Sequence, residues 1–234
     1  MTAILRRELS AYFLSPIGYI YLTVFYVFSG LFFTLNTLMS QRADITPVFS
    51  GMSTIVLFLI PILTMRLLSE DKKNKTDQAL LTAPISLVGL VFGKFLAAVM
   101  VFLMGISITI VYGIIVNVFT PPNWAIIWGN FIALTLLGMA LISIGMLISA
   151  LTENQVIAAV GGFAVGFLLL LIDALSSFFQ NPIIRQVLRE LSFSRHFSAF
   201  PSGIFNFASI FFFISVTAVF VFLTVRVLEK RRWG

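Results

Sequence analysis

The sequence of 234 residues contains no cysteine and one histidine, and only 10% of its residues are charged. The missing cysteine excludes disulfides, thiol catalysis and thiolate metal sites, and one histidine is too few for a histidine-based metal site. A soluble domain carries about 25% charged residues. Because 59% of this chain is hydrophobic, we expect an all-α integral membrane protein whose solvent is lipid.

The net charge of +6 would suggest nucleic acid as the partner of a soluble protein. Here the basic residues flank long apolar runs, so the membrane surface is the expected partner and nucleic acid is not. The sequence also holds no paired-carboxylate site and no Ser/His/Asp constellation. We therefore do not expect an enzyme, and we expect no catalytic, cofactor or metal site within the chain.

The apolar runs predict six membrane-spanning helices within a single domain, because a crossing needs about 20 predominantly apolar residues. Pro121 and Pro122 split an uncharged stretch that is too long for one helix. The predicted spans are approximately 16–39, 49–68, 88–118, 124–151, 156–179 and 204–225.

Lysine and arginine predict the orientation. Eleven of the 15 basic residues fall on one side of the six spans and four on the other. The asymmetry predicts that both termini and the loop at residues 70–94 lie in the cytoplasm. The protein would then be a multi-pass protein of the cytoplasmic membrane.

Residues 1–15 are predicted to form a short helix in the membrane interface. Apolar residues from Ile4 to Phe13 recur at roughly helical spacing, with Arg6, Arg7 and Glu8 between them. A frayed terminus is the alternative.

The outer segment 181–201 is predicted to be an amphipathic piece that dips into the outer leaflet. Apolar residues from Ile183 to Leu191 form one helical face, and Arg185, Arg189 and Glu190 lie on another. An ordinary outer loop with a surface helix is the alternative.

Two features inside the fifth span are candidates for packing or translocation. Gly162 and Gly166 form a GxxxG pattern, which lets two helices approach closely, either within the chain or between two copies. Asp173 is the acid inside this span, and intramembrane acids are functional candidates. Solvation of Asp173 by outer headgroups is the alternative.

The loop at residues 70–94 concentrates charge between two spans. It carries seven of the 24 charged residues: Glu70, Asp71, Lys72, Lys73, Lys75, Asp77 and Lys94. Gly89 to Phe95 superficially resembles a phosphate-binding loop, but the spacing is one residue short and Phe95 stands where the loop needs a hydroxyl. The loop therefore offers a surface to a partner, or its lysines meet anionic lipid, but it does not bind nucleotide.

This loop resembles the signature region of the type-2 ABC exporter permeases. The matching residues are Thr76, Leu80, Leu81, Thr82, Pro84, Ile85, Ser86, Gly93 and Lys94, and Gln78 departs from the usual glutamate. Ser15 to Tyr19 and Leu151 to Gln155 are similar to the permeases associated with bacterial gliding motility.

The resemblance implies a permease that pairs with a second copy or a paralogue and docks onto two copies of a cytoplasmic ABC ATPase. ATP and Mg²⁺ would be bound by that ATPase and not by this chain. The resemblance further implies a coupling helix near Thr76–Leu81, braced by the N-terminal helix, and a re-entrant outer segment. The implied coupling residues are Glu70, Asp71, Lys72, Thr76, Asp77, Gln78, Leu80, Leu81, Thr82 and Pro84.

The expected function is efflux of a lipid-linked, amphipathic or hydrophobic cargo, driven by the ATPase. The alternative is a membrane anchor without transport, through which ATPase strokes move an extracytoplasmic partner. A secondary transporter is disfavoured because such proteins need buried mid-membrane charges, and Asp173 alone supplies little.

Overall fold

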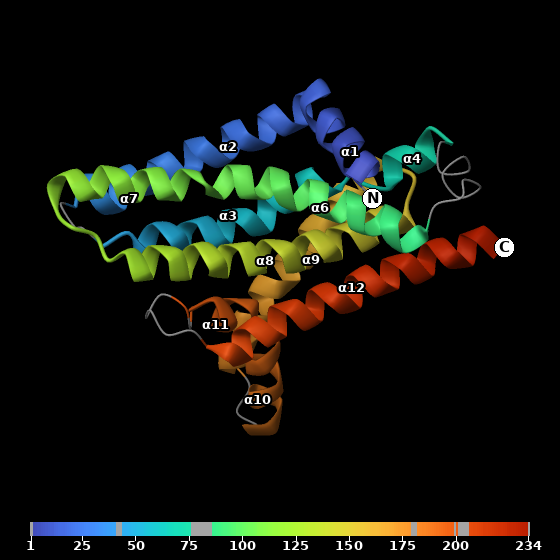
Figure 1. Cartoon of the computed structure of the whole chain (residues 1–234). Helices are drawn as coiled ribbons and strands as arrows, with labels where there is room; N and C mark the ends of the chain where they lie inside the picture. The colour runs from blue at the N-terminus through green and yellow to red at the C-terminus, as the bar shows by residue number, and fades with distance from the viewer. Residues whose placement is uncertain are drawn as a thin grey trace.

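The structure, a computed structural model, describes residues 2–40, 44–75, 86–178, 182–198, 200 and 206–233. All regular secondary structure in these ranges is helical (Figure 1). The elements are α1 (Thr2–Leu14), α2 (Pro16–Phe33), the π-helix η1 (Thr34–Leu38), α3 (Thr46–Thr64), α4 (Ser69–Lys73), α6 (Leu87–Ile106), α7 (Ile108–Phe119), α8 (Trp124–Leu151), α9 (Gln155–Phe178), α10 (Pro182–Leu191), α11 (Phe193–Ser198) and α12 (Phe207–Trp233).

Six helical stretches of the described chain are long and apolar enough to cross a membrane, which confirms the predicted all-helical fold with six candidate spans. They run Pro16–Leu38, Thr46–Lys73, Leu87–Phe119, Trp124–Leu151, Gln155–Ile172 and Phe207–Arg232.

The third and fourth spans separate at the proline pair. Pro121 and Pro122 lie between α7 and α8 and cannot continue a helix. The Asn123 side chain then accepts a hydrogen bond of 3.1 Å from the backbone N–H of Ala125. This bond satisfies one of the unpaired donors of the first turn, so α8 begins where the prolines end.

Both ends of the described chain lie at one end of the helix bundle (Figure 1). We call it the charged end, and it holds α1, α4, the start of α6 and the C-terminal turns of α12. The opposite end holds η1, the start of α3 and the α7–α8 connection. α12 continues to Trp233, eight residues past the predicted end of the sixth span at 225, and Arg226 and Glu229 pair along the surface of this extension at 2.7 Å.

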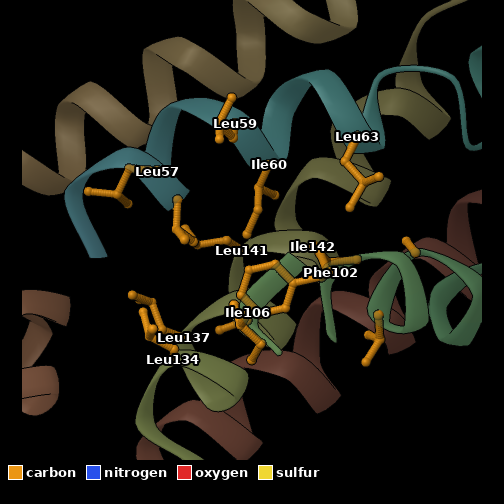
Figure 2. Close-up of a cluster of buried hydrophobic side chains, with 14 of the residues drawn as sticks. Leu57, Leu59, Ile60, Leu63, Phe102, Ile106, Leu134, Leu137, Leu141 and Ile142 are labelled. Atoms are coloured by element: carbon orange, nitrogen blue, oxygen red, sulfur yellow. The ribbon is translucent and has the colours of Figure 1, made fainter. Parts of the chain in front are cut away.

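The core lies where α3, α6 and α8 meet (Figure 2). Phe102 of α6 is fully buried and points toward α8, where it packs against Gly138. A Cβ at Gly138 would overlap the Phe102 ring. The glycine therefore sets the close approach of α6 and α8 that seats this ring.

The GxxxG pattern of α9 faces α3 of the same chain. A Cβ at Gly162 would lie 2.8 Å from the Pro61 Cβ, and one at Gly166 would lie 3.0 Å from the Leu57 carbonyl oxygen. Glycine at both positions therefore lets α9 approach α3 closely. Of the two interpretations given above, the structure places this pattern at a helix contact within the chain.

The outer segment forms two helices. α10 packs against α9, and α11 lies among α8, α9 and α12. Phe193 and Phe197 of α11 are buried, and Phe193 meets the ring of Phe213 at a centroid distance of 5.7 Å. The segment is thus held to the bundle through α11, whereas α10 projects from it (Figure 1).

Candidate functional site

Charged side chains from distant parts of the sequence meet at the charged end. The Lys94 ammonium on α6 lies 3.0 Å from Glu8 Oε1 of α1 and 2.7 Å from Asp71 Oδ2 of α4. The Lys94 side chain is only 2% exposed, and those of Glu8 and Asp71 are 9% and 15% exposed. One buried cation therefore joins three separate helices, and we call Glu8, Asp71 and Lys94 the Lys94 cluster.

Arg7 places a second cation at the edge of this cluster. Its guanidinium donates to Glu8 Oε1 at 2.7 Å and lies 3.6 Å from Asp71 Oδ1. The hydrogen bond to Glu8 raises the pKa of Arg7 against the opposing effect of burial. Two carboxylates and two cations thus balance in charge, which a cluster this poorly exposed requires.

The start of α6 determines where Lys94 lies in the bundle. The Ser86 side chain accepts a hydrogen bond of 3.2 Å from the backbone N–H of Gly89, which caps the helix. Lys94 then lies two turns into α6, on the side that contacts α1.

A second group of contacts fastens α1 to the end of α3. The Tyr12 hydroxyl donates to the Leu63 carbonyl oxygen at 2.8 Å, and Tyr12 is almost fully buried. The Arg66 guanidinium carbon lies 5.3 Å from the centre of the Tyr12 ring. Arg66 also donates to the Ala11 carbonyl at 3.2 Å and pairs with Glu70 at 2.8 Å. α1 is therefore a packed part of the bundle and not a frayed terminus.

The turn between α3 and α4 is anchored to α8 by one hydroxyl. The Ser149 Oγ accepts from the backbone N–H groups of Leu68 and Ser69, both at 3.1 Å, and donates to the Met65 carbonyl at 3.0 Å. Buried polar groups of a turn need such partners. α4 is thereby held against the C-terminal end of α8.

Two further contacts join the remaining helices to this end. Lys72 of α4 lies 3.3 Å from Glu153 in the α8–α9 turn, and Glu153 is largely exposed. Arg231 of α12 donates to the Ala150 carbonyl of α8. A cation at the C-terminal end of a helix also meets its negative dipole end.

A comparison with protein families agrees with this arrangement of helices. The sequence model of the family described as ABC-2 family transporter protein matches residues 12–229 of the chain. The chain belongs to this family. No curated protein matches the chain.

Membership makes the chain the permease of an ABC transporter and a multi-pass membrane protein. Permeases of this family are membrane subunits without an ATPase site of their own, and they generally work with a cytoplasmic ABC ATPase.

The permease brings together some of the residues singled out from its sequence. Glu70, Asp71 and Lys72 lie on α4 and all three form ion pairs, with Arg66, Lys94 and Glu153 respectively. Arg6 is exposed on α1, beside the paired Arg7 and Glu8. The expected coupling residues Thr76, Asp77, Gln78, Leu80, Leu81, Thr82 and Pro84 lie outside the described residues.

The loop expected over residues 70–94 overlaps helices at both ends, and its last residues also belong to the third span predicted over 88–118. α4 covers its first residues, and α6 begins at Leu87, so Lys94 lies inside a helix and is buried. The sequence offered one signal for this: Lys94 stands alone in an apolar run that starts at Leu87. Asp173 lies within α9, and its side chain is outside the part of the chain that the structure describes.

Proposed function

We propose that this permease is the membrane subunit of an ATP-driven exporter, and that its charged end receives the movement of a separate ATPase. The supporting observation is the Lys94 cluster, in which one buried ammonium joins carboxylates of α1 and α4. Residues 76–85 connect α4 to α6, so the cluster ties together the two helices that flank this connection. A partner that presses on the connection would then move α1, α4 and α6 together.

The docking segment in this proposal is residues 76–85, whose sequence resembles the coupling region of type-2 permeases. Lys73 and Lys75 precede it, and Lys73 belongs to the exposed side of α4. Exposed charges of this kind favour register and partner choice more than affinity. Asp71 instead acts inside the chain, because it faces Lys94.

The assembled exporter in this proposal holds two ATPase copies, which bind ATP and Mg²⁺, and a second permease copy or a paralogue. The charged end lies in the cytoplasm of a bacterial or archaeal cell. Its support is the excess of basic residues, since 11 of the 15 lysines and arginines belong to this end.

The cargo that this interior suits is lipid-linked, amphipathic or hydrophobic. Hydroxyl groups inside the spans are largely used by their own helices, as in the bonds from Ser143 to the Ala140 carbonyl and from Thr217 to the Phe213 carbonyl, at 2.7 and 2.8 Å. Such hydroxyls add little polarity to a path between the helices.

The experiment replaces residues 76–82 with a glycine–serine segment of equal length in the permease, reconstituted with its partner ATPase. We expect ATP hydrolysis to fall to the rate of the ATPase alone while the permease still inserts. The matched control replaces residues 41–43, which connect η1 to α3 at the opposite end, and should hydrolyse ATP as the unaltered complex does. Full stimulation in the 76–82 variant would refute the docking assignment.

A second function is transmission of movement without transport, as the resemblance to gliding-associated permeases implies. Two small cavities between the spans favour it: one among α3, α8, α9 and α11 measures about 40 Å³, and one among α3, α8 and α9 measures about 10 Å³. A larger cavity of about 230 Å³ lies at the opposite end, between Ile45 and the α7–α8 connection. Proteoliposomes with a fluorescent lipid in one leaflet separate the two functions. ATP-dependent transfer of that lipid supports export, whereas stimulated hydrolysis without transfer supports transmission.

A further inference from the structure

α10 is amphipathic, and much of its apolar side is uncovered. Its aliphatic residues recur at positions 183, 184, 187, 188 and 191, which form one face of a helix. Ile183, Val187 and Leu191 on this face are 72%, 54% and 51% exposed. A stripe of this kind on a ten-residue helix is too short to span a membrane and needs a cover.

Arg185 and Arg189 stand one turn apart beside this stripe. Both are exposed, and neither forms an ion pair with any described residue. The third arginine of the outer segment differs, because Arg195 lies 2.7 Å from Glu190 and is thereby neutralised. The guanidinium groups of Arg185 and Arg189 lie on one flank of α10 and are therefore available to bind an anion.

α10 follows a membrane-spanning helix, so the bilayer is the apolar medium within its reach. α10 begins four residues after the end of α9, whose exposed apolar residues Phe167, Leu168, Leu171 and Leu175 continue along the span. α10 packs against α9 and stands away from α2, α3 and α7 (Figure 1).

The orientation of α10 is held from its C-terminal end. The two ring nitrogens of His196 lie 3.1 Å from the Glu190 carbonyl oxygen and 3.1 Å from Ser209 Oγ of α12. The His196 ring also stacks on Phe212 at a centroid distance of 4.1 Å. These contacts tie the last turn of α10 to α12, so its apolar side has a defined direction.

We propose that α10 lies in the membrane interface and that Arg185 and Arg189 bind the phosphate of an anionic phospholipid. The aliphatic stripe enters the acyl chains, and the two guanidinium groups donate to phosphate oxygens at headgroup depth. Arginine suits this role because its planar donors match a phosphate in a bidentate manner. The proposal requires only that the chain is embedded in a membrane, so it stands or falls independently of the ATPase coupling proposed above.

The first test locates α10 with spin labels, which the cysteine-free chain allows at single sites. Val187→Cys carries a label on the apolar face, and Gln186→Cys is its matched control on the polar face. In nanodiscs that contain phosphatidylglycerol, the Val187 label should collide with dissolved oxygen and the Gln186 label with a water-soluble nickel complex. A Val187 label shielded from both reagents and dipolar-coupled to a label on a second copy would overturn the proposal, because the face would then be a protein interface.

The second test measures headgroup preference. A fluorophore at Val187→Cys is quenched by brominated phosphatidylglycerol or by brominated phosphatidylcholine, and the ratio gives the relative affinity. Each basic residue near an anionic surface is worth about a five-fold change in affinity, so Arg185→Gln with Arg189→Gln should lower the preference roughly 25-fold. The matched control replaces both members of the existing ion pair, Glu190→Gln with Arg195→Gln, which leaves the net charge unchanged and should keep the preference.

Two results would overturn the headgroup assignment. One is an unchanged preference in the Arg185→Gln, Arg189→Gln variant, and the other is an equal loss in the Glu190→Gln, Arg195→Gln control. The unaltered chain supplies a further check that needs no folding of a variant. Its preference for phosphatidylglycerol should fall as salt screens the guanidinium groups, and a preference independent of salt would also overturn the assignment.

Discussion

Replacing Lys94 with methionine keeps the length of the side chain and removes the charge that holds the Lys94 cluster together. Each ion pair of Lys94, at 3.0 and 2.7 Å, has a gross Coulomb attraction of about 6 kcal/mol at an effective dielectric constant of about 20. Desolvation of the buried groups offsets much of this attraction. The net loss of stability in the variant is therefore set by the carboxylates of Glu8 and Asp71 that remain without the Lys94 ammonium.

Lys94→Met leaves the carboxylates of Glu8 and Asp71 poorly solvated, with Arg7 as their remaining cation. Breaking a buried pair by removing one partner costs about 3–5 kcal/mol. We expect about 3 kcal/mol here, at the lower end of that range, because Arg7 still lies 2.7 Å from Glu8 and is half-exposed. This corresponds to a roughly 160-fold change in the folding equilibrium.

The assay is equilibrium unfolding in mixed micelles as the fraction of denaturing detergent rises, followed by tryptophan fluorescence and circular dichroism. The matched control is Lys72→Met at the same end of the bundle. Its partner Glu153 is 69% exposed, so we expect a loss within about 1 kcal/mol. If both variants lost equal stability, the Lys94 ammonium would contribute no more than an exposed ion pair, and its proposed role in holding the Lys94 cluster together would be wrong.

A neutral version of the cluster completes this test. Glu8→Gln and Asp71→Asn in the Lys94→Met background remove the uncompensated carboxylates, so most of the lost stability should return. Coupling to the ATPase should not return, because the ion pairs that align α1, α4 and α6 are gone. Recovery of stimulated hydrolysis along with stability would show that the charges themselves carry no coupling.

Two further predictions concern packing and pH. Gly138→Ala should cost about 1–3 kcal/mol of unfolding free energy, because the new Cβ would overlap the buried Phe102 ring, and Phe102→Leu should recover part of this loss; an unaltered unfolding curve would contradict this packing. Burial raises the pKa of the Tyr12 hydroxyl above its ordinary value, so folding favours the protonated form and the stability that it adds is lost as pH rises above about 10. Tyr12→Phe should therefore flatten the fall of stability in alkaline solution by about 1.4 kcal/mol per pH unit, measured by unfolding at several pH values, and an equally steep fall would refute the assignment.

The fold was predictable because lipid makes strict demands on a sequence. Apolar run length reports a span directly, and Pro121 and Pro122 mark a break that no helix can cross. The sixth span was predicted to end at 225, whereas the helix α12 continues to Trp233. A helix can continue through charged residues outside the hydrocarbon, as α12 does where Arg226 pairs with Glu229.

The Lys94 cluster was not predictable because its members are far apart in the sequence. Glu8 and Lys94 are separated by 86 positions, and although Lys94 stands alone in an apolar run, that run does not indicate Glu8 as its partner. Arg6, Arg7 and Glu8 form the polar part of a short helix, and Lys94 was taken to close a charged loop. Local periodicity indicates which face of a helix is polar, but it does not indicate which other helix supplies the counter-charge.

The chemistry of the cluster itself suggests what its charges contribute. A buried ion pair adds less to stability than apolar residues of similar size would, so stability alone is a weak reason for placing a lysine inside α6. Charges with fixed partners do define register, because Lys94 reaches both carboxylates only when α1, α4 and α6 keep their relative positions. Leucine or phenylalanine contacts would tolerate sliding of α4, whereas an ion pair of 2.7 Å between Lys94 and Asp71 is lost if α4 shifts by a few ångströms. The cluster is therefore suited to transmit a displacement of residues 76–85 and poorly suited to absorb it, which is the property that the proposed coupling to an ATPase requires at this end of the permease.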